Sequence, residues 1–184
     1  MRRFIFNLVS VLFSAVKFGI MKLFHFHHFF YSGVQRFSPN TEVVIAEGGT
    51  IRLGRHVRAH RRSKLLAMDG GTLEIGSNTA LGNGVSVNCM ESIVIGEGVQ
   101  IGPDTKIYDH DRVPGGIGAG KFVTAPVTIG DNSWIGCNVV ILRGTSIGKN
   151  CIVGAGSVLK GTYPDNSVIV QKRQTTVTVY PTGT

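Results

Sequence analysis

A histidine flanked by two aspartates, Asp109-His110-Asp111, is the group in this sequence best suited to chemistry. A neutral imidazole takes a proton from a hydroxyl or an amine near neutral pH, because its ordinary pKa is about 6.5. A neighbouring carboxylate can hold the imidazole in one tautomer and stabilise the imidazolium. We therefore expect His110 to be a general base with Asp109 as its catalytic partner, although a solvated turn would use the same residue types.

The segment that contains His110 interrupts an internal repeat of six residues. An aliphatic residue followed by glycine recurs at Ile75-Gly76 and Leu81-Gly82, and the period runs without a break from Ile129 to Leu159. A period of six suits neither an amphipathic helix nor a long hairpin. It suits a coil with three short faces, in which the aliphatic residue points inward and the glycine serves the turn. Stacked coils then form a solenoid of parallel strands. We expect about five coils, with a degenerate first coil at residues 51–66.

Two interruptions of the period mark the candidate site. The spacing stretches to eight residues between Val87 and Ile95, and it reaches 22 residues between Ile107 and Ile129. Residues inserted into a solenoid leave the coil as loops, and such loops often carry function. The sequence therefore predicts one extruded loop over 108–126, with His110 at its entrance.

Three stretches resemble the hexapeptide-repeat acyltransferases, in particular the bacterial sugar and polysaccharide O-acetyltransferases related to the maltose- and galactoside-type enzymes. These stretches are Tyr108–His110, Pro126–Gly144 and Val153–Val158, and the resemblance extends over roughly residues 50–170. The resemblance implies a left-handed parallel β-helix, acetyl-CoA as acyl donor, no metal, and a homotrimer with active sites between neighbouring subunits. It also implies a histidine base in the extruded loop.

The same resemblance implies further site residues. The predicted substrate-binding residues are Tyr108, Arg112 and Trp134, and the predicted acetyl-CoA-binding residues are Gly136, Asn138, Ala155, Gly156, Lys160, Lys172 and Arg173. One departure matters, because family members often carry a second histidine where this chain has Arg112. Arginine cannot act as a base, since it is always protonated, but it can bind an anionic group. Either His110 serves as the base or catalysis is altered or lost.

The N-terminal segment is apolar, but it is interrupted at helical spacing. Polar residues at Asn7, Ser10, Ser14 and Lys17 fall on one stripe of a helix whose other faces are Phe, Leu, Ile and Val. The lysines at 17 and 22 argue against a spanning helix, and an in-plane helix at a membrane surface competes with a helix packed on the protein itself. We expect three regions: an amphipathic helical segment at 1–38, the β-helix at 39–170 and a tail at 171–184.

Composition and charge narrow the function classes. The 25 glycines and 42% hydrophobic residues exclude collagen and argue against disorder and an all-helical fold. Residues 1–64 hold 11 Lys/Arg against two acids, whereas the remainder is nearly neutral. This asymmetry indicates an anionic partner for the N-terminal part. The three cysteines are odd in number and favour a reducing compartment.

The predicted function is O-acetylation of a hydroxyl on a capsular, exo- or lipopolysaccharide, or on its lipid-linked precursor. We expect a cytoplasmic protein that lies peripherally on the inner face of the plasma membrane through residues 1–30 and binds no nucleic acid. The alternatives are an N-acetyltransferase acting on an amino sugar nucleotide and a non-catalytic solenoid used for assembly. A metal-dependent lyase of the γ-carbonic anhydrase type would need three facing histidines. It is disfavoured because His56 and His60 lie several coils from His110.

Overall fold

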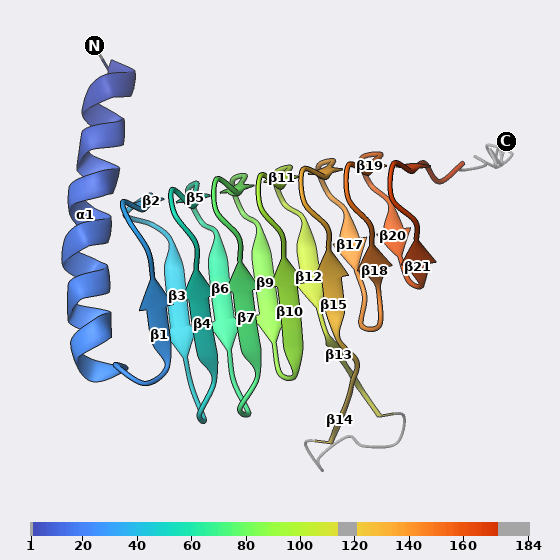
Figure 1. The fold of residues 1–184 in the computed structure, drawn as a ribbon, viewed down its shortest axis with the longest axis horizontal. Helices are drawn as coiled ribbons and strands as arrows, with labels where there is room; N and C mark the ends of the chain where they lie inside the picture. The colour runs from blue at the N-terminus through green and yellow to red at the C-terminus, as the bar shows by residue number, and fades with distance from the viewer. Residues whose placement is uncertain (1, 114–120, 173–184) are drawn as a thin grey trace, which may run out of the picture.

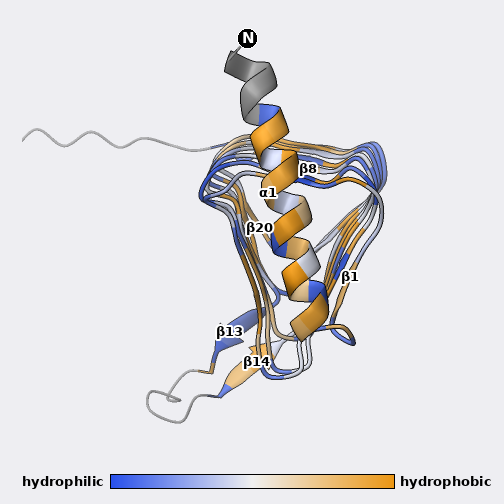
Figure 2. Cartoon of the chain, turned by 90° about the vertical axis from the view of Figure 1, so that its left-hand side faces the viewer, coloured by the Kyte–Doolittle hydropathy of each residue, from blue (hydrophilic) through white to orange (hydrophobic). Residues whose placement is uncertain are grey.

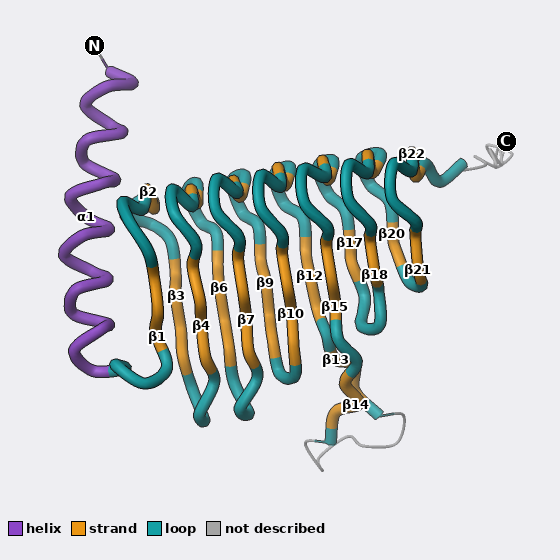
Figure 3. Tube along the Cα trace, in the orientation of Figure 1, coloured by secondary structure: helices purple, strands orange, loops and turns teal. Residues whose placement is uncertain are grey.

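The computed structural model describes residues 2–113 and 121–172, which form one helix followed by a three-sided parallel β-helix (Figure 1). The helix α1 (Arg2–Phe24) lies across the N-terminal end of the solenoid. The strands take their places on three faces in strict rotation, so that each coil contributes one strand to each sheet. An antiparallel hairpin leaves the solenoid in the middle of the chain (Figure 3).

The three sheets are named here A, B and C. Sheet A contains β1 (Phe29–Tyr31), β4 (Thr50–Leu53), β7 (Thr72–Ile75), β10 (Ser92–Ile95), β15 (Val127–Ile129), β18 (Ser146–Ile147) and β21 (Thr162–Tyr163). Sheet B contains β2 (Arg36–Phe37), β5 (Arg58–Ala59), β8 (Ala80–Leu81), β11 (Gln100–Ile101), β16 (Trp134–Ile135), β19 (Ile152–Val153) and β22 (Val168–Ile169). Sheet C contains β3 (Glu42–Ile45), β6 (Lys64–Ala67), β9 (Ser86–Cys89), β12 (Lys106–Tyr108), β17 (Val140–Ile141) and β20 (Val158–Leu159).

The solenoid is longer than the repeat predicted, and it narrows toward its C-terminal end. Six strands in sheet C and seven in each of the others make six complete coils and part of a seventh, against about five expected. Ladder partners lie 22 residues apart from Phe29 to Ile51, but 18 apart from Ile129 to Ile147 and 16 apart from Ile147 to Tyr163. The parallel-solenoid prediction is confirmed.

The first coil begins at Phe29, well before residue 51 and also before the expected boundary at residue 39. The six-residue period did not detect it because the first coils are wide: their strands on sheets A and C span up to four residues and are joined by longer turns. Phe29, Phe37 and Val43 fill the interior of this coil. The helical part of the N-terminal segment accordingly ends at Phe24, rather than extending through residues 1–38.

The repeated glycines are required by the stacking of coils rather than by turn conformation. A Cβ built on Gly130 would lie 2.5 Å from the backbone carbonyl carbon of Gly148, and one on Gly102 would lie 2.6 Å from the backbone N of Cys137. Neither glycine has a positive φ. The left-handed positions are mostly taken by other glycines, such as Gly98 and Gly156, and by Asn and Asp, which tolerate this region. The expectation that a side chain would be costly at these turn positions is confirmed, and the cost arises from contact with the next coil rather than from the backbone conformation.

The helix packs on the first coil with its polar stripe inward. Ser10 and Ser14 are buried, and the Ser14 hydroxyl accepts a 2.7 Å hydrogen bond from the backbone N–H of Phe37. Lys17 Nζ donates to the carbonyl oxygen of Thr41 at 2.8 Å. Phe18 is buried between Phe29 and Phe37, with ring centroids 5.1 and 4.8 Å away. The helix thereby covers the open end of the aliphatic column.

Candidate active site

The corner between sheets C and A carries the candidate site, at the point where the chain leaves the fourth coil. β12 ends at Tyr108, and the chain continues into the hairpin of β13 (His110–Arg112) and β14 (Phe122–Thr124). His110 pairs with Thr124 in this hairpin, and Arg112 pairs with Phe122. The predicted loop over 108–126 is therefore a β-hairpin at its base, and its residues 114–120 lie outside the described part of the chain.

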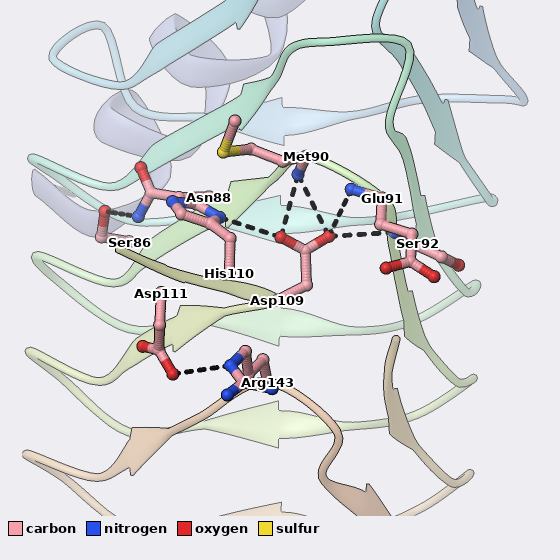
Figure 4. Close-up of polar contacts among 9 residues, drawn as sticks. All are labelled: Ser86, Asn88, Met90, Glu91, Ser92, Asp109, His110, Asp111 and Arg143. Atoms are coloured by element: carbon pink, nitrogen blue, oxygen red, sulfur yellow. Dashed lines mark hydrogen bonds and ion pairs between the residues drawn. The ribbon is translucent and has the colours of Figure 1, made fainter. Parts of the chain in front are cut away.

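Asp109 is the structural centre of this corner. Its side chain is fully buried, and its carboxylate accepts hydrogen bonds from the backbone N–H groups of Met90, Glu91 and Ser92 at 2.8 to 3.1 Å (Figure 4). These donors belong to the stretch between Val87 and Ile95 in which the repeat spacing lengthens to eight. The two interruptions seen in the sequence thus meet at one carboxylate.

His110 is held by the same carboxylate. Its Nδ1 lies 3.0 Å from Asp109 Oδ1, and its side chain is 14% exposed. An ionised carboxylate only accepts hydrogen bonds, so Nδ1 carries the proton and Nε2 of a neutral ring keeps its lone pair. The Phe122 ring meets the imidazole edge-on, with centroids 5.3 Å apart. The arrangement therefore presents one basic nitrogen on a ring whose tautomer and orientation are fixed.

The thiol next to Asp109 is not a candidate nucleophile. Burial, together with the charge of Asp109, raises the pKa of the Cys89 thiol well above its usual range. A thiol with a raised pKa is a poor nucleophile because it stays protonated. The chemistry that this corner supports is proton transfer by His110.

Two polar features of this corner were not identified from the sequence. Asp111 Oδ2 accepts a 2.8 Å hydrogen bond from Arg143 Nε, which ties the hairpin to the next coil (Figure 4). Asn88 is the ladder partner of Tyr108, and its amide donates to Ser86 Oγ at 3.0 Å. Aligning Val87 with Ile107 in the repeat would have placed Asn88 beside Tyr108. No short-range signal links Asp111 with Arg143.

Arg112, which stands where the resemblance implies a second histidine, lies at the outer end of β13. Its guanidinium carbon is 5.3 Å from the centroid of the Phe122 ring, in the range of a cation–π contact. Tyr108 lies two residues before His110, and its ring centroid is 6.0 Å from that of His110. The structure therefore groups Tyr108, His110 and Arg112 at one corner.

Four of the residues predicted to bind acetyl-CoA lie together at a different corner, between sheets B and C. Gly136 and Asn138 belong to the turn between β16 and β17, and Ala155 and Gly156 belong to the turn stacked on it. The backbone N–H of Gly156 donates to the carbonyl oxygen of Cys137 at 2.8 Å. A Cβ on Gly136 would lie 2.6 Å from the backbone N of Ala155, so this glycine is needed for stacking.

The remaining predicted residues are distributed over the C-terminal coils. Trp134 is 54% exposed on sheet B, which runs along the upper side in Figure 1, whereas the His110 hairpin projects from the lower edge. Lys160 is exposed at the corner between sheets C and A, two coils beyond His110. Lys172 follows Gln171, whose side-chain amide bonds the backbone of Val158. Arg173 lies outside the described residues. A single chain therefore does not bring His110, Trp134 and the small-residue corner together.

Comparisons with known proteins agree with this architecture. The model of the family described as bacterial transferase hexapeptide (six repeats) matches residues 126–161. Solved structures that share the fold include two acyltransferases. AntD of Bacillus cereus, an N-acyltransferase solved with coenzyme A and a dTDP-4-amino sugar, is 20% identical with a TM-score of 0.65 and covers 84% of each chain. The hexapeptide-repeat acetyltransferase VCA0836 of Vibrio cholerae, solved with acetyl-CoA, is 25% identical with a TM-score of 0.54 and covers 86% of this chain and 73% of that one.

Sequence relatives carry acetyltransferase names. An acetyltransferase-like protein of Mycobacterium tuberculosis, Rv3034c, is 33% identical over 65% of this chain, which spans only 41% of that relative. WbbJ of Escherichia coli, named for lipopolysaccharide biosynthesis O-acetyl transfer, is 30% identical over 68% of this chain and 69% of its own length. With that coverage, the matching repeat model and the parallel three-sided solenoid, the chain belongs to the hexapeptide-repeat acyltransferases.

Proposed function

We propose that this protein transfers the acetyl group of acetyl-CoA to a hydroxyl group of a glycan, with His110 as general base. The observation that carries the proposal is the Asp109–His110 pair at the break of the repeat, in which a fully buried carboxylate lies 3.0 Å from Nδ1. The name of WbbJ, which refers to O-acetyl transfer in lipopolysaccharide biosynthesis, supports a glycan acceptor. The acetyl-CoA found in the Vibrio cholerae relative supports the donor.

The proposed step is a direct transfer without a covalent enzyme intermediate. His110 Nε2 removes the proton of the acceptor hydroxyl while that oxygen attacks the carbonyl carbon of the thioester. The C–S bond then breaks, and the thiolate of CoA takes the proton back from the imidazolium. Asp109 compensates the positive charge that the ring carries between these events. The backbone N–H groups of 90–92 already bond Asp109, so this carboxylate keeps its position throughout the cycle.

Transfer to an amine of a sugar nucleotide is the alternative within the same chemistry. It needs the same base and donor, and the fold is shared with AntD, an N-acyltransferase. O-acetyl esters and N-acetyl amides differ in stability toward mild alkali, because hydroxide cleaves the ester but leaves the amide. Alkali treatment of the labelled product therefore separates the two alternatives.

The test is incubation of the protein with radiolabelled acetyl-CoA and a panel of glycans, lipid-linked glycans and amino sugar nucleotides. We expect label in a glycan and its release by mild alkali. Alkali-resistant label would favour the N-acetyl alternative. No turnover together with no heat of binding for CoA in calorimetry would overturn the proposal and favour a non-catalytic solenoid.

The matched variants are His110→Ala and His27→Ala, the second at an exposed histidine near the end of α1. Loss of a general base lowers kcat by roughly 10²- to 10⁴-fold, so His110→Ala should fall in this range while His27→Ala retains the activity. Both variants should keep the thermal midpoint of the parent within a few degrees. Full activity of His110→Ala would show that the base is another residue.

A further inference from the structure

The helix α1 carries large apolar side chains on the face that points away from the solenoid, in addition to Phe18, which packs against it. Its small polar residues, Ser10 and Ser14, are buried against the solenoid. Large apolar side chains point away from the protein, and Leu12, Val16 and Leu23 are 58, 65 and 76% exposed. Leu8, Val9, Ile20 and Phe24 are also among the exposed large hydrophobic residues. Figure 2 looks onto the end of the solenoid that the helix crosses.

The two lysines that interrupt the apolar sequence do not interrupt this outer face. Lys17 Nζ donates to the Thr41 carbonyl oxygen at 2.8 Å, and Lys22 Nζ donates to that of Phe29 at 3.0 Å. Burial lowers the pKa of Lys17, consistent with an ammonium drawn in beside the first coil. Both cations are thus directed toward the solenoid. The outer face is therefore more apolar than the linear sequence indicates.

The length and composition of the helix alone would also suit a membrane span. Residues Asn7–Phe24 have a mean hydropathy of 1.5 over 18 residues, but only 17% of this window is buried. A helix that crossed a bilayer would have to take Ser14 and Lys17 away from Phe37 and Thr41. The packing against the first coil therefore favours a helix lying in the plane of a membrane surface.

A cationic cleft adjoins the apolar face. A cleft of about 230 Å³ between α1 and the first coil is lined by Val11, Phe18, Tyr31 and Val34, among others. Val11 and Val34 also line a second cleft of about 210 Å³, whose other residues are Arg36, His56 and Arg58. An apolar cleft therefore continues into one lined by cationic side chains. This is the chemistry that recognises a lipid with an anionic headgroup.

The arrangement of the arginines strengthens the case for an anion. Arg36 and Arg58 are direct ladder partners on adjacent strands of sheet B. Both side chains line the same cleft, so an anion that enters it meets two guanidinium groups. Their charge and, above all, burial lower the pKa of the neighbouring His60. Two copies joined through this surface by a twofold axis would place like-charged clusters near one another, which disfavours a second copy as occupant.

We propose that the outer face of α1 and the Arg36–Arg58 cleft form a docking surface for a bilayer containing anionic phospholipid. The apolar side chains enter the interfacial region, and the arginines bind lipid phosphates. In a bacterial cell this surface would hold the protein on the inner face of the plasma membrane. The inference does not depend on the proposed acetyl transfer, because none of its residues lies at the His110 corner.

The experiment is co-sedimentation of the full chain with vesicles of phosphatidylcholine alone or with about one third phosphatidylglycerol. We expect binding that increases with phosphatidylglycerol and decreases with salt. Leu12→Gln/Val16→Gln should reduce the partition coefficient at least about tenfold, because two large apolar side chains leave the interface. The matched control is Val168→Gln/Val170→Gln, which changes side chains that are 69 and 66% exposed at the other end of the solenoid.

The contribution of the arginines to membrane binding is tested separately. Arg58→Gln should weaken binding to the anionic vesicles about fivefold and leave binding to phosphatidylcholine vesicles unchanged. Lys149→Gln removes the same charge far from α1 and should leave binding to both kinds of vesicle unchanged. Equal binding of Leu12→Gln/Val16→Gln and of the parent would overturn the proposal, as would no binding to anionic vesicles. Concentration-dependent association in ultracentrifugation that Leu12→Gln/Val16→Gln abolishes would instead assign the face to a second copy. Resistance of the membrane-bound protein to alkaline carbonate would assign it to a membrane span.

Discussion

At the scale of single residues, Asp109 links the fold to the proposed chemistry. Its carboxylate closes the turn at 90–92 through backbone N–H groups and also bonds His110 Nδ1. A fully buried carboxylate is stable only when its charge is compensated by hydrogen bonds, and these partners supply them. We therefore regard Asp109 as a positioning residue for His110 and as a structural residue of the corner.

Replacing Asp109 with Asn should affect both functions. The amide keeps one acceptor oxygen but gains an NH₂ group that cannot accept the N–H bonds, so the corner should lose about 1–3 kcal/mol of stability. The imidazole should also lose its preference for the Nδ1–H tautomer, which nitrogen-15 NMR of the ring reads directly. The unchanged tautomer in Asp109→Asn would contradict a positioning role, whatever happened to the stability. Asp111→Asn is the control, since its carboxylate bonds Arg143 and not His110.

Ser10 and Ser14 are both buried in α1, but replacing each with alanine should change the free energy of unfolding in opposite directions. The Ser10 hydroxyl is buried and has no hydrogen-bond partner within the described part of the chain, whereas the Ser14 hydroxyl accepts from the backbone N–H of Phe37. Ser10→Ala should raise the free energy of unfolding by up to about 1 kcal/mol, because alanine removes a buried unpaired hydroxyl and favours the helix. Ser14→Ala should lower it by about 1–3 kcal/mol, because the Phe37 N–H is left unpaired. Urea titrations of both variants decide the matter, and equal effects would contradict the assigned packing of α1.

At the scale of elements, the sequence predicted best what depends on local spacing. The aliphatic–glycine period placed the inward residues Ile75, Ile129 and Ile147, all of which are buried. It did not detect the first coil, because Phe29 lies eight residues before Phe37, Val43 lies eight before Ile51, and no glycine follows Phe29, Phe37 or Val43. It marked the break at 108–126 but not the hairpin within it, because strand pairing between His110 and Thr124 leaves no pattern in so short a segment.

The same limit applies to the candidate site. The loop position and the Asp109–His110 neighbourhood followed from the sequence, because both are local. The contact between Asp111 and Arg143 joins residues in different coils, and only the register of the stacked strands places them together. The sequence predicted a polar stripe along α1, but hydropathy does not indicate whether this stripe faces the protein or the solvent.

Two glycine-to-alanine changes test whether glycine is needed within α1 and at the turns between stacked coils. Gly19 lies in α1 with open space around a built Cβ, so Gly19→Ala should stabilise the protein by about 0.5–1 kcal/mol. Gly130 lies where a Cβ would meet the backbone of Gly148 and Lys149 at 2.5 and 2.6 Å, so Gly130→Ala should destabilise by about 1–3 kcal/mol or more. Thermal unfolding of the two variants measures both effects. A neutral Gly130→Ala would show that the coils can separate locally without cost.

At the scale of the whole molecule, charge and chemistry occupy separate regions. The basic residues concentrate in residues 1–64, which form α1 and the first coils, whereas the His110 corner lies in the fourth coil. Within one chain the candidate base and Trp134 also lie on different sides of the solenoid. If both act on one acceptor, as the family resemblance implies, neighbouring subunits must supply them. The trimer expected from the resemblance would provide such an arrangement.

Subunit complementation tests this requirement. His110→Ala and Trp134→Ala chains should each be nearly inactive alone. When differently tagged copies are co-expressed and mixed oligomers are purified, a site between subunits can combine the intact His110 of one chain with the intact Trp134 of another. In a purified mixed trimer, one of the three sites combines both intact groups, so activity should recover toward about one third of the parent value. Mixed oligomers that remain as inactive as the separate variants would show that each chain must supply both groups, and would contradict a site shared between subunits. A mixture of two His110→Ala chains is the control, because it contains no intact base.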